Sequence, residues 1–303
     1  MTEPRPVPYG ASAQITLRQD DDEHTRRLRA YSHLYRVGQR YRIIRAVGTA
    51  AFAAAPLVTW QLPGIADYVA AAAGAWLIVS RLLLGWAETR QVEAAVNVQE
   101  LYDTELFLLP WNTAVSGEPP LPEVVTDAAR KMKPDSRFDA WFRTDLDGVP
   151  WPADALLCQR ESAVWSRADH RGYGLALLTV SAMLFLGTLA FGLLEDLTLV
   201  DYLIKLGLPI SPALLDTVEL GRTHLRFAGR RERLVRDMTD LVKEHRASLA
   251  DVPASECRRV QDEAYRLRRD APRVPKFYYD LRRNARHATT VEGNAELLGR
   301  PRA

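Results

Sequence analysis

Aromatic and arginine residues are dense in the polar stretches that lie between and after the most apolar segments of the chain. Aromatic rings stack on nucleobases, and the planar guanidinium group of arginine binds phosphate through paired hydrogen bonds. This combination is typical of a site for a small nucleotide. The residues that we expect to contribute to such a site are Trp111, Asn112, Gln159, Arg160, Trp165, Arg171, Arg266, Tyr278 and Tyr279.

The same aromatic residues could instead form the core of a small helical domain. The polar stretch between the apolar segments is short of isoleucine and valine, so Trp111, Trp141 and Trp165 would be its natural core-forming side chains. Taken one residue at a time, the core interpretation is favoured over ligand binding. Both interpretations stay open on the sequence alone.

The residue patterns of catalytic and metal sites are missing from the sequence. The six histidines lack metal-site spacing, and Cys158 and Cys257 are isolated thiols. Gly172 and Gly174 resemble a fragment of a phosphate-binding loop, but they run into an apolar segment instead of following a strand. We therefore expect no catalytic residue, no metal and no cofactor, and a membrane enzyme is the least favoured hypothesis.

The most apolar element that must position these residues is the segment 173–194, which contains no charged residue. A helix of this length covers roughly 30 Å, the thickness of the hydrocarbon core of a bilayer. A soluble helix of that length normally has a polar face, and this one has none. The segment is therefore predicted to span a membrane.

Two alanine-rich segments, 43–62 and 65–86, are predicted to form a membrane hairpin that precedes this span in the chain. Their connecting turn is very short, and Trp60 and Trp86 stand at span ends, where amphipathic rings favour the membrane interface. Arg45 and Arg81 lie near one common end, from which their long side chains can reach water. The alternative is a buried hairpin of a soluble protein, because alanine is only mildly apolar.

The segment 197–220 is less regular, since Pro209 and Pro212 interrupt it and charged residues occur at both ends. It could be a kinked span, a re-entrant segment or an interfacial helix, and we favour the kinked span. Asp201 and Lys205 are four residues apart and share one helix face. They either line an aqueous path as pore residues or lie outside the membrane, before the span begins.

Arginine residues flank the outer ends of both hairpins, whereas neither hairpin turn contains one. The excess of positive charge on cytosolic loops then places both termini and the central segment in the cytosol. The chain is predicted to be an all-α membrane protein with four spans in two transmembrane hairpins and a helical cytosolic region. Its predicted parts are a disordered leader at 1–30, a juxtamembrane helix and first hairpin at 31–86, a cytosolic insert at 87–172, a second hairpin at 173–220, C-terminal cytosolic helices at 221–280 and a loose tail at 281–303.

Several short sequence blocks occur in an order that is similar to a known family. Gln-Glu-Leu-Tyr-Asp-Thr at 99–104 leads to Leu-Pro-Trp-Asn at 109–112, then Leu-Cys-Gln-Arg at 157–160, and finally Val-Pro-Lys-Phe-Tyr-Tyr at 274–279. With the two hairpins between them, these blocks resemble the SMODS-associating four-transmembrane effector family over residues 31–279. Ser162, Ser166 and His170 depart from the family pattern, so we assign no function to those positions.

The resemblance implies a pore-forming effector of a bacterial antiphage system, located in the inner membrane. A cyclic oligonucleotide made by a cGAS-like nucleotidyltransferase would be sensed in the cytosol, and the spans would then breach the lipid bilayer. Four small helices enclose little water, so we expect a homo-oligomer, and neither DNA nor RNA is an expected partner. The alternative is a membrane scaffold or sensor that recruits a cytosolic partner through a basic helix at 222–249.

Overall fold

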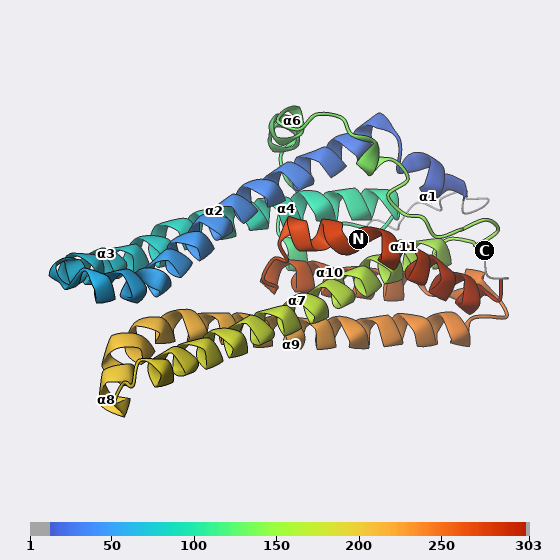
Figure 1. Ribbon diagram of the computed structural model, residues 1–303. Coiled ribbons are helices and arrows are strands. Elements are labelled where there is room, and N and C mark those ends of the chain that lie inside the picture. Colours follow the sequence, from blue (N-terminus) through green and yellow to red (C-terminus); the bar gives the residue numbers. More distant parts are fainter. Residues whose placement is uncertain (1–12, 301–303) are drawn as a thin grey trace. The chain divides into compact units, whose positions relative to one another are not determined.

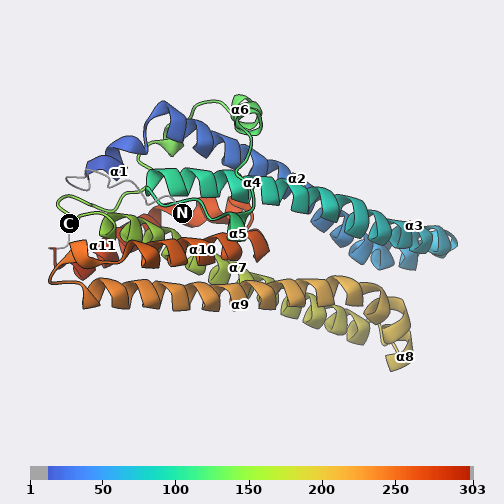
Figure 2. The same ribbon diagram turned by 180° about the vertical axis from the view of Figure 1, so that it is seen from behind.

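The computed structural model describes the backbone of residues 13–300, and all side chains there except those of residues 13, 14, 56, 57, 60, 61, 63, 137, 277 and 279–288. Within this part the chain is helical and has no strand. The helices, labelled in Figures 1 and 2, are α1 (Ala13–Arg18), α2 (Asp22–Gln61), α3 (Ala66–Val79), α4 (Gly85–Leu106), α5 (Thr113–Ser116), α6 (Pro122–Arg130), α7 (Ala153–Leu194), α8 (Leu199–Tyr202), α9 (Leu208–Glu244), α10 (Ala254–Asp270) and α11 (Lys276–Leu298).

The chain divides into two compact units. The first unit contains Met1–Arg36, Val92–Asp169 and Phe227–Ala303, and the second contains Val37–Gln91 and His170–Arg226. The long helices α2, α4, α7 and α9 each have residues in both units. A π-turn at Ser80–Leu84 joins α3 to α4, and another at Leu203–Gly207 joins α8 to α9, so neither connection interrupts the helix.

The first unit has an apolar core built by α2, α4, α7, α9 and α10. Tyr102, Leu106, Leu156 and Met238 are fully buried in this core. Tyr31 packs edge-on against Tyr102, with ring centroids 5.9 Å apart, and against Trp141, at 6.4 Å. The core interpretation of the aromatic residues is therefore correct for Trp141.

The disordered leader and the loose tail are corrected by the structure. Residues 13–30 form α1 and the start of α2, and Ile15 and Leu28 are buried in the core of the first unit. Residues 1–12 lie outside the described part. The tail is helical up to Leu298, and Asn294 is fully buried there. A few buried side chains stabilise each segment. The high average polarity of the two segments hides this from a reading of the sequence.

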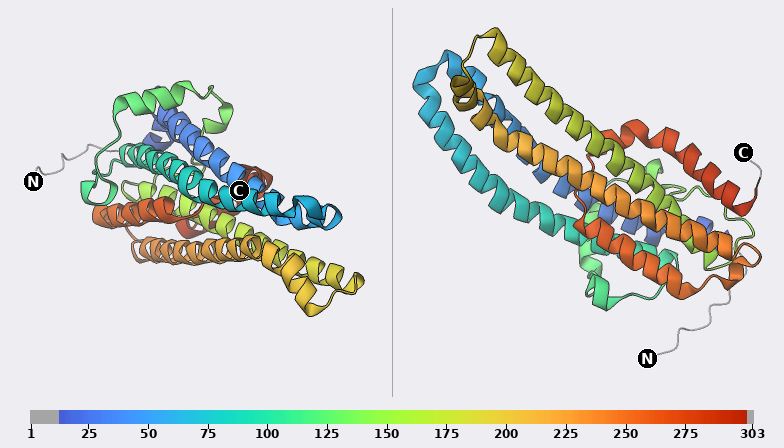
Figure 3. Two further views of the ribbon diagram at one scale, coloured as in Figure 1. Left: turned by 90° about the vertical axis from the view of Figure 1, so that its left-hand side faces the viewer. Right: turned by 90° about the horizontal axis from the view of Figure 1, so that it is seen from below.

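The second unit consists of two helical hairpins, one formed by α2 with α3 and one by α7 with α8 and α9. Figures 1 and 2 show α2 and α3 running side by side, and both views in Figure 3 show the same for α7 and α9. Gly48 lies against the ring of Trp76, and a Cβ atom at Gly221 would stand 3.1 Å from the carbonyl oxygen of Gly174. Small residues thus allow close helix contacts in each hairpin.

The apolar side chains of the second unit point outward. Of the large apolar side chains that are described as exposed, all but Leu17, Leu121 and Val124 belong to this unit. Two continuous helices, Ala66–Leu106 and Ala153–Leu194, are long and apolar enough to cross a membrane. Only 6% and 11% of their most apolar windows are buried, unlike the core helix of a soluble protein.

The segment predicted at 197–220 is one continuous helical stretch. Thr198 caps its start, because its side chain accepts a hydrogen bond from the Asp201 backbone N–H at 3.1 Å. From Leu199 the chain stays helical through the π-turn and Pro212 to Glu244. The helix therefore accommodates the irregular segment through the π-turn and with Pro212 in its interior. The chain does not reverse direction there, as a re-entrant loop would.

Candidate functional site

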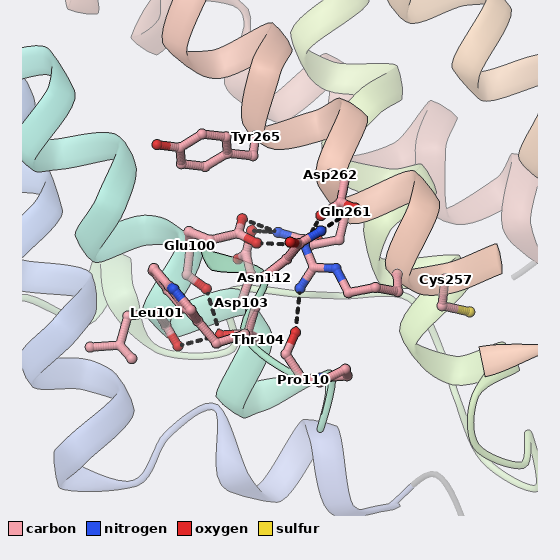
Figure 4. A network of polar contacts seen from close by, with 12 residues as sticks. Glu100, Leu101, Asp103, Thr104, Pro110, Asn112, Cys257, Gln261, Asp262 and Tyr265 are labelled. Carbon is pink, nitrogen blue, oxygen red and sulfur yellow. Dashed lines mark hydrogen bonds and ion pairs between the residues drawn. The ribbon is translucent and has the colours of Figure 1, made fainter. Parts of the chain in front are cut away.

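A buried network of polar side chains in the first unit centres on Gln261 of α10 (Figure 4). The Gln261 side-chain amide donates hydrogen bonds to Glu100 Oε2 at 2.8 Å and to Asp103 Oδ2 at 3.0 Å. Its Oε1 atom accepts a hydrogen bond from the Gln159 amide at 3.0 Å. One fully buried side chain therefore connects α10 to both α4 and α7.

Helix α4 places Glu100 and Asp103 in the interior because it is surrounded by other elements over this stretch. Val98, Tyr102 and Leu106 are also fully buried, whereas Gln99 and Glu105 on the same helix are only half-buried, so Glu100 and Asp103 lie on the core-facing side of α4. Buried carboxylates need hydrogen-bonding or charged partners, since desolvation otherwise costs several kcal/mol. The amides and arginines of α10 supply those partners.

Two arginines of α10 form ion pairs with the buried carboxylates of α4. Arg258 Nη2 lies 2.7 Å from Glu100 Oε1 and 2.7 Å from Asp262 Oδ1. The other terminal nitrogen of Arg258 donates to the carbonyl oxygen of Pro110 at 2.8 Å, and Arg268 pairs with Asp103. Burial raises the pKa of Glu100, and the hydrogen bond from Arg258 opposes that shift.

The accessible edge of the network is formed by the Leu-Pro-Trp-Asn block after α4. Asn112 donates from its side-chain nitrogen to Asp262 Oδ2 at 2.8 Å. Trp111 donates from its ring nitrogen to the carbonyl oxygen of Gly117 at 2.8 Å, and it is only half-buried. Trp111 therefore lies at the rim of the network, outside the fully buried core.

Arg160, which follows Gln159 on α7, belongs to a different network. Its side chain donates to Thr239 Oγ1 at 3.0 Å and to the Asn294 side-chain oxygen. Asn294 in turn donates to Thr144 Oγ1 at 2.8 Å, and Thr144 donates to Glu161 at 2.6 Å. This second network joins α7 to α9 and α11.

The remaining predicted ligand residues are not gathered at either network. Arg266 is exposed on α10 and lies 3.8 Å from Glu263. Trp165 is half-buried on α7, and Arg171 is exposed in the second unit. Tyr278 is half-buried in the first turn of α11, and the side chain of Tyr279 lies outside the described residues.

The predicted pore residues Asp201 and Lys205 form an ion pair of 2.8 Å beside the turn of the second hairpin. Asp201 also accepts a hydrogen bond from the Thr198 hydroxyl at 2.7 Å, so it belongs to the helix cap. This position fits the alternative that both charges lie outside the span.

Sequence reasoning missed four charged members of the Gln261 network, Glu100, Asp103, Arg258 and Arg268. Glu100 and Asp103 are three residues apart, and they flank the apolar residues Leu101 and Tyr102 of α4. Charges placed that close to core residues were the available signal for buried pairing.

The network is built of side-chain amides and paired charges. Burial raises the pKa of Cys257 to about 12, so this thiol is protonated at neutral pH and is a poor nucleophile. Within the described residues, no group of three or more histidine, cysteine or acidic side chains could hold a metal ion. Amides and paired charges connect four segments of the chain at one place.

Comparison with known proteins identifies the family. The SMODS-associating 4TM effector domain matches residues 13–297, which is most of the chain. A Bacillus cereus (strain VD146) protein described as a probable CBASS effector molecule is 25% identical over 224 residues, covering 73% of this chain and 75% of that protein. No solved structure matches the chain. The chain therefore belongs to the SMODS-associating 4TM effector family.

Proposed function

We propose that this protein is a pore-forming effector of a CBASS antiphage system that acts on the bacterial inner membrane. In this proposal a cyclic oligonucleotide activates the cytosolic first unit, and several copies of the second unit assemble into a pore. Both hairpins span the bilayer, which gives four spans and places both termini in the cytosol. The effector family and the CBASS name of the related protein support the defence role.

The observation that carries the membrane part is the outward-facing apolar surface of the second unit. Its exposed large apolar side chains, such as Leu82, Met183 and Leu186, would face water in a soluble protein. Exposed apolar surface on this scale is typical of contact with lipid or with other subunits. The arginine bias at the outer hairpin ends supports the proposed orientation.

The Gln261 network supports the coupling of a cytosolic signal to the membrane. Glu100 and Asp103 lie on the continuous helix Ala66–Leu106, and Gln159 lies on Ala153–Leu194. These are the two helices that are long and apolar enough to span a membrane, and Gln261 bonds to both. A ligand that shifts α10 would therefore act on both helices at once.

The rim of the same network is where we place the ligand. Trp111 offers a half-buried aromatic face, and the amide of Asn112 and the exposed guanidinium group of Arg266 belong to the same unit. A cyclic oligonucleotide has both bases and phosphates, which stacking and guanidinium groups recognise.

The alternative of a scaffold that recruits a partner through the basic helix 222–249 is less well supported. In the structure this segment is part of α9, and Leu234, Met238 and Val242 of its apolar stripe are buried in the core of the first unit. That stripe is therefore occupied and does not offer a docking face.

Dye release from liposomes reconstituted with the full chain tests the proposal. We expect a cyclic di- or trinucleotide from a panel to trigger release, and the matching linear nucleotides to have no effect. Vesicles that stay intact with every cyclic nucleotide and at every protein-to-lipid ratio would contradict it.

A substitution at the rim separates ligand recognition from membrane insertion. Trp111→Ala is expected to abolish the ligand response because it removes the stacking surface, whereas Trp111→Phe should retain most of it. Both variants should insert into membranes like the parent chain. An unchanged response of Trp111→Ala would remove Trp111 from the proposed ligand site.

A further inference from the structure

An ion pair joins the two hairpins of the second unit. The Arg81 Nη2 atom lies 2.7 Å from Asp216 Oδ1 and 2.8 Å from Asp216 Oδ2. Arg81 belongs to the first hairpin and Asp216 to the second, 135 residues further along the chain. The side chains are 59% and 44% exposed, so protein atoms do not enclose the pair.

The surroundings of this pair differ from those of an ordinary surface salt bridge. Both residues lie within the proposed spans, near their cytosolic ends, and their neighbours Leu82, Leu83 and Leu215 are exposed apolar side chains. A charge in such an apolar layer is costly unless it is paired or reaches water. Pairing with the opposite hairpin is therefore strongly favoured over leaving two separate charges.

Both partners also sit at irregular points of their helices. Arg81 is the second residue of the π-turn Ser80–Leu84, and Asp216 follows Pro212, a proline inside α9, by one turn. Single π-turns are frequent at functional sites, and an internal proline removes a backbone hydrogen bond and favours a kink. Helices are easier to bend at such points than in a regular stretch.

We propose that the Arg81–Asp216 ion pair is the closing contact of the pore, and that its two charges line the water path once the hairpins separate. This inference rests on the proposed pore function and assigns its charged residues. It replaces Asp201 and Lys205, whose ion pair lies within one hairpin, beside its turn, and belongs to a helix cap.

A simpler role is also conceivable, in which Arg81 only extends its side chain towards water at the membrane surface. That role needs no partner of opposite charge. The two roles therefore differ in what happens when Asp216 alone is changed, and in whether exchanging the two charges restores the parent behaviour.

The test measures dye release from liposomes in the absence of any nucleotide. Arg81→Gln and Asp216→Asn should each leak at a rate at least tenfold above the parent chain, and the double variant Arg81→Asp with Asp216→Arg should return close to the parent rate. Neutralising a charge in the membrane lowers the cost of insertion, so both single variants are expected to insert. Glu88→Gln is the matched control, because Glu88 pairs with Arg45 at 2.7 Å within the first hairpin and should leave the resting leak unchanged.

A second measurement checks that the charges line the open path. In voltage-clamped bilayers, Arg81→Gln should shift the permeability of the activated pore towards cations, and Asp216→Asn should shift it towards anions.

Resting vesicles of both single variants that are as tight as the parent, or a charge exchange that leaks as much as the single variants, would overturn the inference. If parent vesicles fail to leak with any cyclic nucleotide, the pore function itself fails; if they respond normally while the single variants stay tight, only the role of this ion pair fails.

Discussion

The two units of this protein place polar and apolar side chains in opposite ways. The first unit buries an apolar core together with charged groups such as Glu100 and Asp103, each of which has several partners. The second unit exposes leucine, isoleucine and phenylalanine side chains and has small residues such as Gly174 and Gly221 at its helix contacts. The contrast shows that the two units are adapted to different surroundings.

Helix α7 passes through both arrangements. Near its start Gln159 and Glu161 are buried beside an apolar core, and towards its end Met183 and Leu186 are exposed on a stretch with no charge. A single continuous helix thus has one end buried beside an apolar core and the other end with exposed apolar side chains. In the proposed function, this continuity would transmit a signal from the first unit to the second.

The largest expected effect concerns the buried charges of the first unit. Arg268→Met leaves Asp103 without its cationic partner in the interior, and removing one partner of a buried pair typically costs about 3–5 kcal/mol. Chemical denaturation of the detergent-solubilised chain would measure this loss. Arg266→Met on the same helix is the control, since its exposed side chain should change the stability by less than about 0.5 kcal/mol.

Two matched arginine substitutions test whether equally exposed side chains of the two units face different surroundings, lipid in the second unit and water in the first. Met183 is 67% exposed in the second unit, and Leu121 is 66% exposed in the first. Met183→Arg should disfavour insertion by about 2.5–3.5 kcal/mol, because it places a charge at the centre of a span. Leu121→Arg should be neutral within about 0.5 kcal/mol. Equal amounts of both variants in the membrane fraction would contradict the contrast between the units.

The sequence predicts some helices of the two units better than others, because only some of them have a distinctive composition. The segment 173–194 is recognisable because it lacks charge, and in the structure α7 extends from it back to residue 153. The start of α2 at Asp22 has a sequence signal, because Asp22 and Glu23 occupy its first turn, where the helix dipole stabilises acidic side chains. In the sequence they belong to the segment 1–30, which was predicted to be a disordered leader.

The site was only partly predictable for a geometric reason. Gln159 and Arg160 are adjacent on α7, so their side chains point about 100° apart and enter separate networks. Gln261 and Arg266 are likewise on different faces of α10, one fully buried and one exposed. Proximity in the sequence suggested one site, whereas helical geometry divides these residues between several surroundings.

A smaller effect is expected for the pH dependence of the first unit. Burial raises the pKa of the Asp154 carboxyl group to about 6, well above its ordinary value, so the folded state holds this proton more tightly than the unfolded state. The stability contributed by this protonated group is present below the unfolded pKa and is lost as pH rises towards and through 6. Asp154→Asn should therefore gain about 1 kcal/mol relative to the parent between pH 5 and pH 7.5. Parallel stability curves for the two proteins over this range would refute the prediction.

The smallest effect is expected at the tip of the second hairpin. Lys205→Gln breaks an ion pair whose side chains are 48% and 41% exposed, and exposed pairs contribute about 0–1 kcal/mol. Insertion and ligand-triggered dye release should both be unchanged. A changed ion selectivity of the activated pore would return Lys205 to the water path and place the turn of this hairpin inside the membrane.

Alkaline carbonate extraction of bacterial membranes, followed by flotation through a density gradient, tests the central claim that the second unit is embedded in lipid. The account predicts that the full chain stays with the floating membranes after the wash, as integral proteins do. Release of the chain into the detergent-free supernatant as a monodisperse protein would contradict the membrane assignment, and with it the pore and its closing contact.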